Sequence, residues 1–192
     1  MVPAEPVEAV IWGVTANLLD GLRGRLSSPR RQTTATMTTT IGRLGRQRVL
    51  LASPHGEAGL EPGRRLAALQ ATHSPRRMIA VGAAAGAIGA CVVAPIEGDR
   101  SIADAVWAVP LNEAARAGGV ELEFIVATAP GPVLAALTSK PGVARRAGRL
   151  VGALLARRGA KADVGPLQGA RRLQAVVADA VGAMLGGEAG GR

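Results

Sequence analysis

The stretch RVLLASPHGEAGLEPGRRLAALQATHSPRRMIAV, residues 48–81, decides the fold. It opens with a compact apolar strand at residues 48–53 and continues into a Gly- and Pro-rich loop at 54–63. A short helix at 64–72 then leads to a second apolar strand at 78–81. Strands that alternate with helices in this way predict an α/β fold with a mostly parallel sheet flanked by helices.

The same alternation continues on both sides of this unit. Further strands are expected at residues 9–14, 90–94 and 120–128, and further helices at 17–26, 110–118, 132–137, 143–158 and 170–185. The last two of these helices are amphipathic. The polar, Thr-rich segment 27–40 is expected to be a loop, and residues 186–192 a flexible tail. At 192 residues the chain is long enough for one domain, 1–192, and too short for two.

The composition limits the chemistry that the chain can perform. One cysteine, Cys91, excludes an internal disulfide and any multi-cysteine metal site, and its apolar surroundings predict a buried, inert thiol. Two histidines make a His-based zinc site or catalytic triad hard to assemble, so we expect no metal and no cofactor.

The start of the chain has no pattern of a secretory signal, and a cytoplasmic location is expected. A core of Ala, Val and Leu with few aromatics predicts modest stability or a homo-oligomer.

Arginine dominates the formal charge of +9. Residues 21–77 carry eleven Arg and two Glu, whereas the middle of the chain is mildly acidic. Such basic blocks suit a polyanionic partner such as nucleic acid or anionic lipid, although a compositional drift toward Ala, Gly and Arg produces the same pattern. One polar face of the expected helix at 143–158 is a candidate for phosphate contacts through Arg145, Arg146, Arg149 and Arg157.

The segment MIAVGAAAGAIGACVVAPI, residues 78–96, contains no charged residue. As a transmembrane helix it is barely long enough, its Ala and Gly content drives insertion weakly, and Pro95 interrupts its end. As a soluble element it divides into two strands around a glycine-rich turn. We favour the soluble division, which makes membrane association the less favoured alternative.

Glycines and a histidine follow two of the expected strands, where α/β sheets commonly bind ligands. His55 and Gly56 follow the strand at 48–53, and Gly82 and Gly86 follow the strand at 78–81. Glycines at such positions allow backbone N–H groups to approach an anion, and His55 can act as an acid or base near neutral pH. The GxxxGxxG spacing after the second strand matches neither the dinucleotide-binding nor the P-loop pattern. We therefore expect a small anionic or nucleoside-like ligand without specifying a reaction.

The order of these motifs resembles the nucleoside phosphorylase and nucleosidase superfamily over residues 41–150. The segments that resemble the family are RVLLASPHGEAG, the helix that starts at Arg64, MIAVGAAAG, ACVVAPIEGD, ADAVWAVPLNEAA and IVATAPGPVLAALTSK. This resemblance implies a nucleoside or phosphorylated small molecule as ligand. The acidic motif by which the family holds ribose is expected near residues 148–155, where this chain reads GRLVGALL. The resemblance therefore implies a degenerate or non-catalytic member. The alternative function is a basic accessory protein that binds nucleic acid or a ribonucleoprotein non-specifically.

Overall fold

The computed structural model describes residues 6–15, 17–55, 61–93, 108–138 and 165–186. Five helices and seven strands lie within these ranges: β1 (Ala9–Gly13), α1 (Asp20–Arg23), β2 (Ser27–Thr33), β3 (Met37–Leu44), β4 (Gln47–Pro54), α2 (Pro62–His73), β5 (Arg77–Ala85), β6 (Gly89–Val93), α4 (Ala108–Ala117), β7 (Glu121–Ala129), α5 (Gly131–Thr138) and α7 (Pro166–Gly186). The strand, helix and second strand of the expected unit are confirmed as β4, α2 and β5, and residues 56–60 of its loop lie outside the described ranges.

The seven strands form a single sheet in the order β2-β3-β4-β1-β5-β7-β6. The four central strands β4, β1, β5 and β7 are parallel, and the outer strands β2, β3 and β6 pair antiparallel. All five residues of β1 are buried, as expected for a central parallel strand that is covered on both faces. The predicted α/β fold with a parallel sheet core is therefore confirmed.

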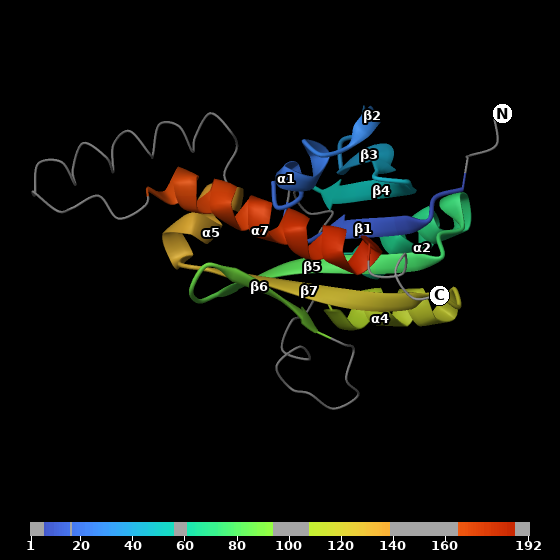
Figure 1. Cartoon of the computed structure of the whole chain (residues 1–192). Helices are drawn as coiled ribbons and strands as arrows, with labels where there is room; N and C mark the ends of the chain where they lie inside the picture. The colour runs from blue at the N-terminus through green and yellow to red at the C-terminus, as the bar shows by residue number, and fades with distance from the viewer. Residues whose placement is uncertain (1–5, 16, 56–60, 94–107, 139–164, 187–192) are drawn as a thin grey trace, which may run out of the picture.

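Helices cover both faces of the sheet (Figure 1). The first layer holds α1, α5 and α7, and its core includes Leu22, Val133 and Leu173 packed against alternate strand residues. The second layer holds α2 and α4, with Leu66 and Leu111 in its core. Neighbouring residues of a strand point to opposite faces, so β1 supplies both cores. The two described aromatic side chains, Trp12 and Phe124, are fully buried in the second core.

The segment 27–40, expected to be a loop, instead forms β2 and the first half of β3. Thr38 and Thr40 are buried while their neighbours are half-buried, so β3 has the alternation of a covered strand with hydroxyls in place of apolar groups. All seven residues of β2 are exposed, and it is held to the sheet by pairing with β3. A strand without buried apolar side chains leaves no hydrophobic pattern in the sequence.

The uncharged segment 78–96 is divided between β5, a turn and β6 over the residues that are described, which confirms the division into two strands. Within the described ranges, no helix is long and apolar enough to cross a membrane.

The predicted end of the strand at 78–81 is wrong, because β5 continues to Ala85 and Gly82 lies inside the strand. Pairing with the long apolar strand β7 supplies Gly82 with a partner, Val126, and overrides the low strand propensity of glycine.

The C-terminal helix is confirmed as α7, which begins at Pro166 and includes Gly186. Residues 187–192 of the expected tail and the expected helix at 143–158 lie outside the described ranges. Cys91 was expected to be buried, but it is exposed on β6 at the edge of the sheet. An edge strand has a neighbour on one side only, so its side chains are less covered than those of a central strand.

Candidate functional site

Two adjacent strands of the sheet send the chain to opposite faces at their carboxyl ends. β1 leads to α1, whose Leu22 belongs to the first core, whereas β4 leads to α2, whose Leu66 belongs to the second. A crevice outside the carboxyl ends of two such strands is where open α/β sheets bind ligands. The ends of β1 and β4 therefore define the candidate site.

The predicted ligand residues follow or belong to β4 and β5, the two strands on either side of β1. Trp12 of β1 pairs with Ala52 of β4, and Gly13 pairs with Val81 of β5. β1 and β4 thus end close together, whereas β5 continues for four more residues, to Ala85. The pairing of β1 with β5 extends one residue beyond β1, because the Val14 N–H donates a hydrogen bond to the Val81 carbonyl at 3.0 Å.

A set of polar side chains, which we call the edge cluster, lies at this position: Asp20, Arg23, Thr38, Ser53 and His55. The Arg23 guanidinium donates through Nη2 to the Ser53 hydroxyl at 2.6 Å and forms an ion pair with Asp20. Ser53 is fully buried, whereas the Asp20 side chain is 44% exposed and that of Arg23 13% exposed. Ser53 therefore positions the guanidinium, and the Asp20 carboxylate is the more exposed of the two charged groups.

His55 forms the second half of the edge cluster. Its Nε2 lies 2.7 Å from the hydroxyl of Thr38, and its backbone N–H donates to the Thr36 carbonyl at 2.8 Å. The Thr38 hydroxyl in turn lies 3.2 Å from that of Thr33 on β2. These contacts fix the imidazole against the β2–β3 hairpin and leave Nδ1 without a partner among the described residues. The ring is half-buried and is positioned to exchange a proton or hydrogen-bond with a ligand.

The other predicted site residues are placed less favourably. Gly82 is buried within β5, and Gly86 donates its N–H to the Ala129 carbonyl at 3.0 Å, so that donor is already occupied. Gly56 and the four candidate phosphate-binding arginines of the 143–158 helix lie outside the described ranges. Within those ranges, no group of three His, Cys, Asp or Glu side chains is close enough to hold a metal.

Sequence reasoning missed Asp20, Arg23, Thr38 and Ser53. Ser53 gave a weak signal as the one hydroxyl at the end of the apolar strand RVLLAS. Arg23 gave none, because its 30-residue separation from Ser53 is bridged by the β2–β3 hairpin, and Thr38 was assigned to a loop.

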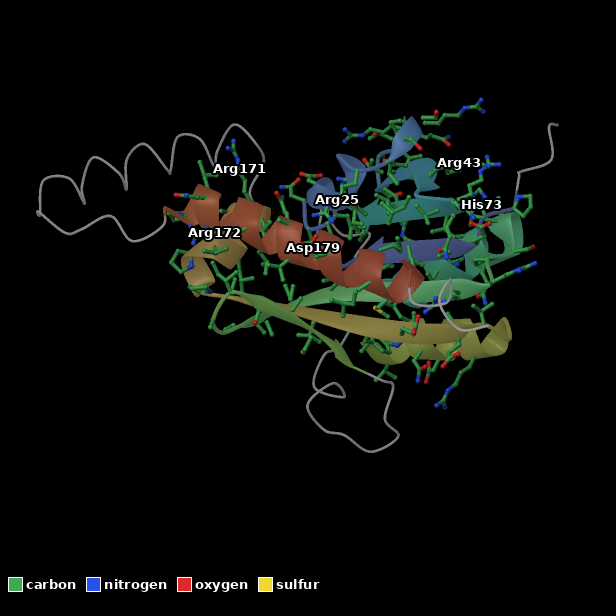
Figure 2. All side chains as sticks on the ribbon, in the orientation of Figure 1. Arg25, Arg43, His73, Arg171, Arg172 and Asp179 are labelled. Carbon is green, nitrogen blue, oxygen red and sulfur yellow. The ribbon has the colours of Figure 1, made fainter. Side chains whose placement is uncertain are left out.

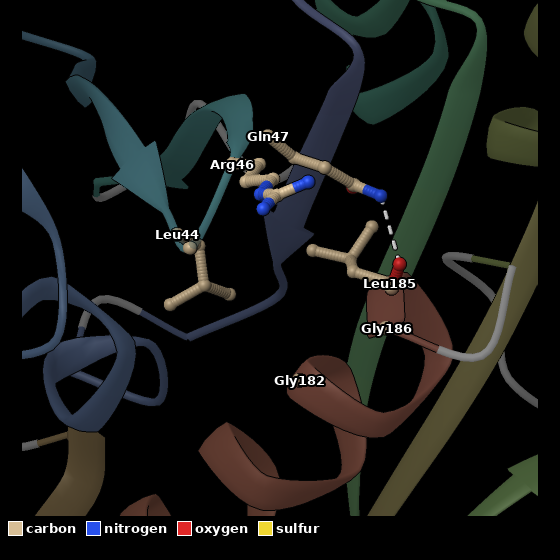
Figure 3. A pocket seen from close by; sticks show the side chains of 7 residues that line it. Leu44, Arg46, Gln47, Gly182, Leu185 and Gly186 are labelled. Atoms are coloured by element: carbon tan, nitrogen blue, oxygen red, sulfur yellow. Dashed lines mark hydrogen bonds between the residues drawn. The ribbon is translucent and has the colours of Figure 1, made fainter. Parts of the chain in front are cut away.

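A separate cavity of about 280 Å³ lies beside the β3–β4 turn, at the opposite end of β4 from the edge cluster (Figure 3). It is mainly apolar, and its lining comes from the β3–β4 turn and the end of α7: Leu44, Gly45, Arg46, Gln47, Gly182, Leu185 and Gly186. Gln47 reaches across to α7 and donates from Nε2 to the Leu185 carbonyl at 2.7 Å. The cavity is thus part of the contact between the end of α7 and the sheet. It lies far from the carboxyl ends of β1 and β4.

No family model and no curated protein matches this sequence. Among solved structures, it is similar to the 5'-methylthioadenosine/S-adenosylhomocysteine nucleosidase of Campylobacter jejuni, with a TM-score of 0.58 and 11% identity over 93% of this chain and 98% of that one. A putative methylthioadenosine nucleosidase from Weissella paramesenteroides gives a TM-score of 0.54 and 9% identity over 95% of this chain and 99% of that one. At such identities the likeness shows a shared fold and no more, and this fold is the one that the resemblance implied.

Proposed function

We propose that this chain binds a small anionic or nucleoside-like ligand, a nucleoside or a phosphorylated small molecule, at the edge cluster. The observation that carries the proposal is the chain of contacts at the carboxyl end of β4: Arg23 pairs with Asp20 and bonds Ser53, Ser53 pairs in register with Thr38, and Thr38 contacts His55. A guanidinium supplies donors for an anionic group, and a carboxylate accepts from ligand hydroxyls. The fold neighbours support the same ligand class, since the C. jejuni and W. paramesenteroides proteins are described as nucleosidases.

The burial pattern supports a binding role for the edge cluster. Ser53 lies at the end of a strand whose preceding four residues are all buried, and its hydroxyl is directed at Arg23. Holding a guanidinium against a buried hydroxyl reduces the side-chain freedom that a ligand must otherwise remove on binding. We propose no reaction, because the acidic ribose motif implied by the resemblance is replaced by GRLVGALL in the sequence.

A thermal-shift screen with inorganic phosphate, ribose 5-phosphate and a set of nucleosides tests this function. A ligand at about one hundred times its Kd stabilises the folded state by about 2.7 kcal/mol. For a domain of this size that stabilisation raises Tm by roughly 5–10 °C. We expect the shift in the wild type and its loss in Arg23→Gln and His55→Ala.

Thr72→Ala is the matched control, because its hydroxyl bonds the Ala68 carbonyl at the far end of α2. This variant is expected to keep the full ligand-induced shift. Each variant's Tm without ligand is measured first, so that a change in stability is separated from a change in binding. The proposal fails if no compound in the set shifts the wild type, or if the shift persists undiminished in both edge-cluster variants.

A further inference from the structure

The outer hairpin of the sheet consists of β2 and β3 with the β3–β4 turn. Its charged residues are all positive. Residues 21–55 contain seven arginines and no Asp, Glu or Lys. Three of these arginines are engaged elsewhere. Arg23 belongs to the edge cluster, Arg25 pairs with Asp179 of α7 at 2.7 Å (Figure 2), and Arg48 has interactions of its own, among them a hydrogen bond from its backbone N–H to the Glu8 carboxylate.

Four arginines remain, and we call them the hairpin arginines: Arg30, Arg31, Arg43 and Arg46. All four are exposed, and none has an ion pair within the described part of the chain. Arg30 pairs in register with Ile41, and Arg43 lies two residues further along β3, so Arg30 and Arg43 lie on one face of the hairpin, whereas Arg31 pairs with Thr40 and lies on the other face. The side chains of Arg30 and Arg43 thus extend from the same face, where both can contact one polyanionic backbone.

Protection of the sheet edge can account for Arg30 and Arg31 on the edge strand β2, but not for all of this charge. Proteins keep edge strands from pairing by means of proline, bulges and charged residues, and β2 carries Pro29 and a bulge between Ser27 and Arg30. Arg43 lies on the inner strand β3, and Arg46 lies in the turn after it, so neither residue guards an edge. Their charge therefore needs another explanation.

We infer that the hairpin arginines dock the phosphate backbone of double-stranded nucleic acid. The charge is complementary to a polyanion, and Figure 2 shows nitrogen-tipped side chains extending outward around this hairpin. No aromatic residue occurs between residues 21 and 55, so the stacking that holds single strands is missing. Among the described residues, the large exposed hydrophobic side chains are Ile88, Val109 and Leu167, and all three lie outside the hairpin, which therefore offers no apolar anchor to a membrane.

Arg43 and Arg46 are separate from the proposed ligand site, and Arg31, opposite Thr40 on β3, is the hairpin arginine that lies nearest to it. His55 and Arg23 lie at the carboxyl edge of the sheet, whereas Arg43 pairs with Arg48 at the other end of β4 and Arg46 follows in the turn. Binding through phosphates alone is sequence-independent and strongly dependent on salt. The hairpin is thus expected to hold any duplex of sufficient length.

The test measures fluorescence anisotropy of a labelled 20-base-pair DNA duplex with the full chain at salt concentrations from 50 to 200 mM. Each phosphate contact contributes about 0.9 to the slope of log K against log salt, so four contacts contribute about 3.6. Over this fourfold range of salt, four contacts correspond to a loss of affinity of about 150-fold. We expect R30Q/R31Q/R43Q/R46Q to remove most of that slope.

The matched control removes the same number of charges from exposed arginines on the helices, R64Q/R116Q/R171Q/R172Q, and is expected to keep the wild-type slope. Arg23→Gln and His55→Ala are also expected to bind the duplex as the wild type does, which separates this inference from the ligand site. Three outcomes overturn the inference: no duplex binding at 50 mM salt, an equal loss of slope in both quadruple variants, or tighter binding of a single strand or of phosphatidylserine vesicles than of the duplex.

Discussion

Replacement of Arg77 by methionine tests how the C-terminal helix is held to the sheet. Arg77 lies at the start of β5 and donates from Nη2 to both carboxylate oxygens of Glu123, at 2.8 and 3.1 Å. Its Nη1 donates to the Met184 carbonyl in the last turn of α7 at 3.1 Å. One guanidinium thus joins two strands and the negative end of a helix.

The size of the effect follows from the burial of the pair. The side chains of Arg77 and Glu123 are 22% and 27% exposed, so the pair is partly screened by solvent. Breaking a fully buried pair costs about 3–5 kcal/mol, because the remaining charge has no counterion. For this partly exposed pair, with the Met184 carbonyl also losing its donor, we expect Arg77→Met to lower the free energy of unfolding by about 2–3 kcal/mol.

Urea denaturation followed by circular dichroism measures this free energy. Arg76→Met is the matched control, since Arg76 is exposed and has no ion pair among the described residues; its effect is expected to stay within about 0.5 kcal/mol. The double variant Arg77→Met/Glu123→Met removes both charges and is expected to recover at least half of the loss. The reasoning is refuted if Arg77→Met matches the control, or if the double variant is no more stable than the single one.

Three further changes test the packing of α7. Gln47→Ala removes the donor to the Leu185 carbonyl and is expected to cost about 1 kcal/mol in urea denaturation, and an unchanged midpoint would contradict that role. Gly182→Ala places a methyl group where nothing lies within 4 Å, so it is expected to raise stability by about 0.5–1 kcal/mol through helix propensity. Gly169→Ala on the same helix brings Cβ to 2.6 Å from Val133 Cγ2 and is expected to lower Tm, so equal effects of the two alanines would count against the packing described.

The sequence alone determined the central α/β unit and the C-terminal helix. The strand at 48–53, the helix at 64–72 and the helix at 170–185 carry their apolar patterns locally, so their type follows from spacing and side-chain chemistry. The same patterns placed His55 at a strand's carboxyl end. The ordering of motifs also pointed to the nucleosidase fold.

The tertiary structure decided the features that depend on a distant partner. Segment 27–40 contains strands because β3 pairs with β4 along its whole length. Gly82 lies in a strand because it pairs with Val126 of β7. The hydrogen bond between Arg23 and Ser53 exists because the tertiary fold places α1 next to the end of β4. A backbone or polar group that leaves water must find a hydrogen-bond partner, and which residue supplies it depends on chain positions far apart in the sequence.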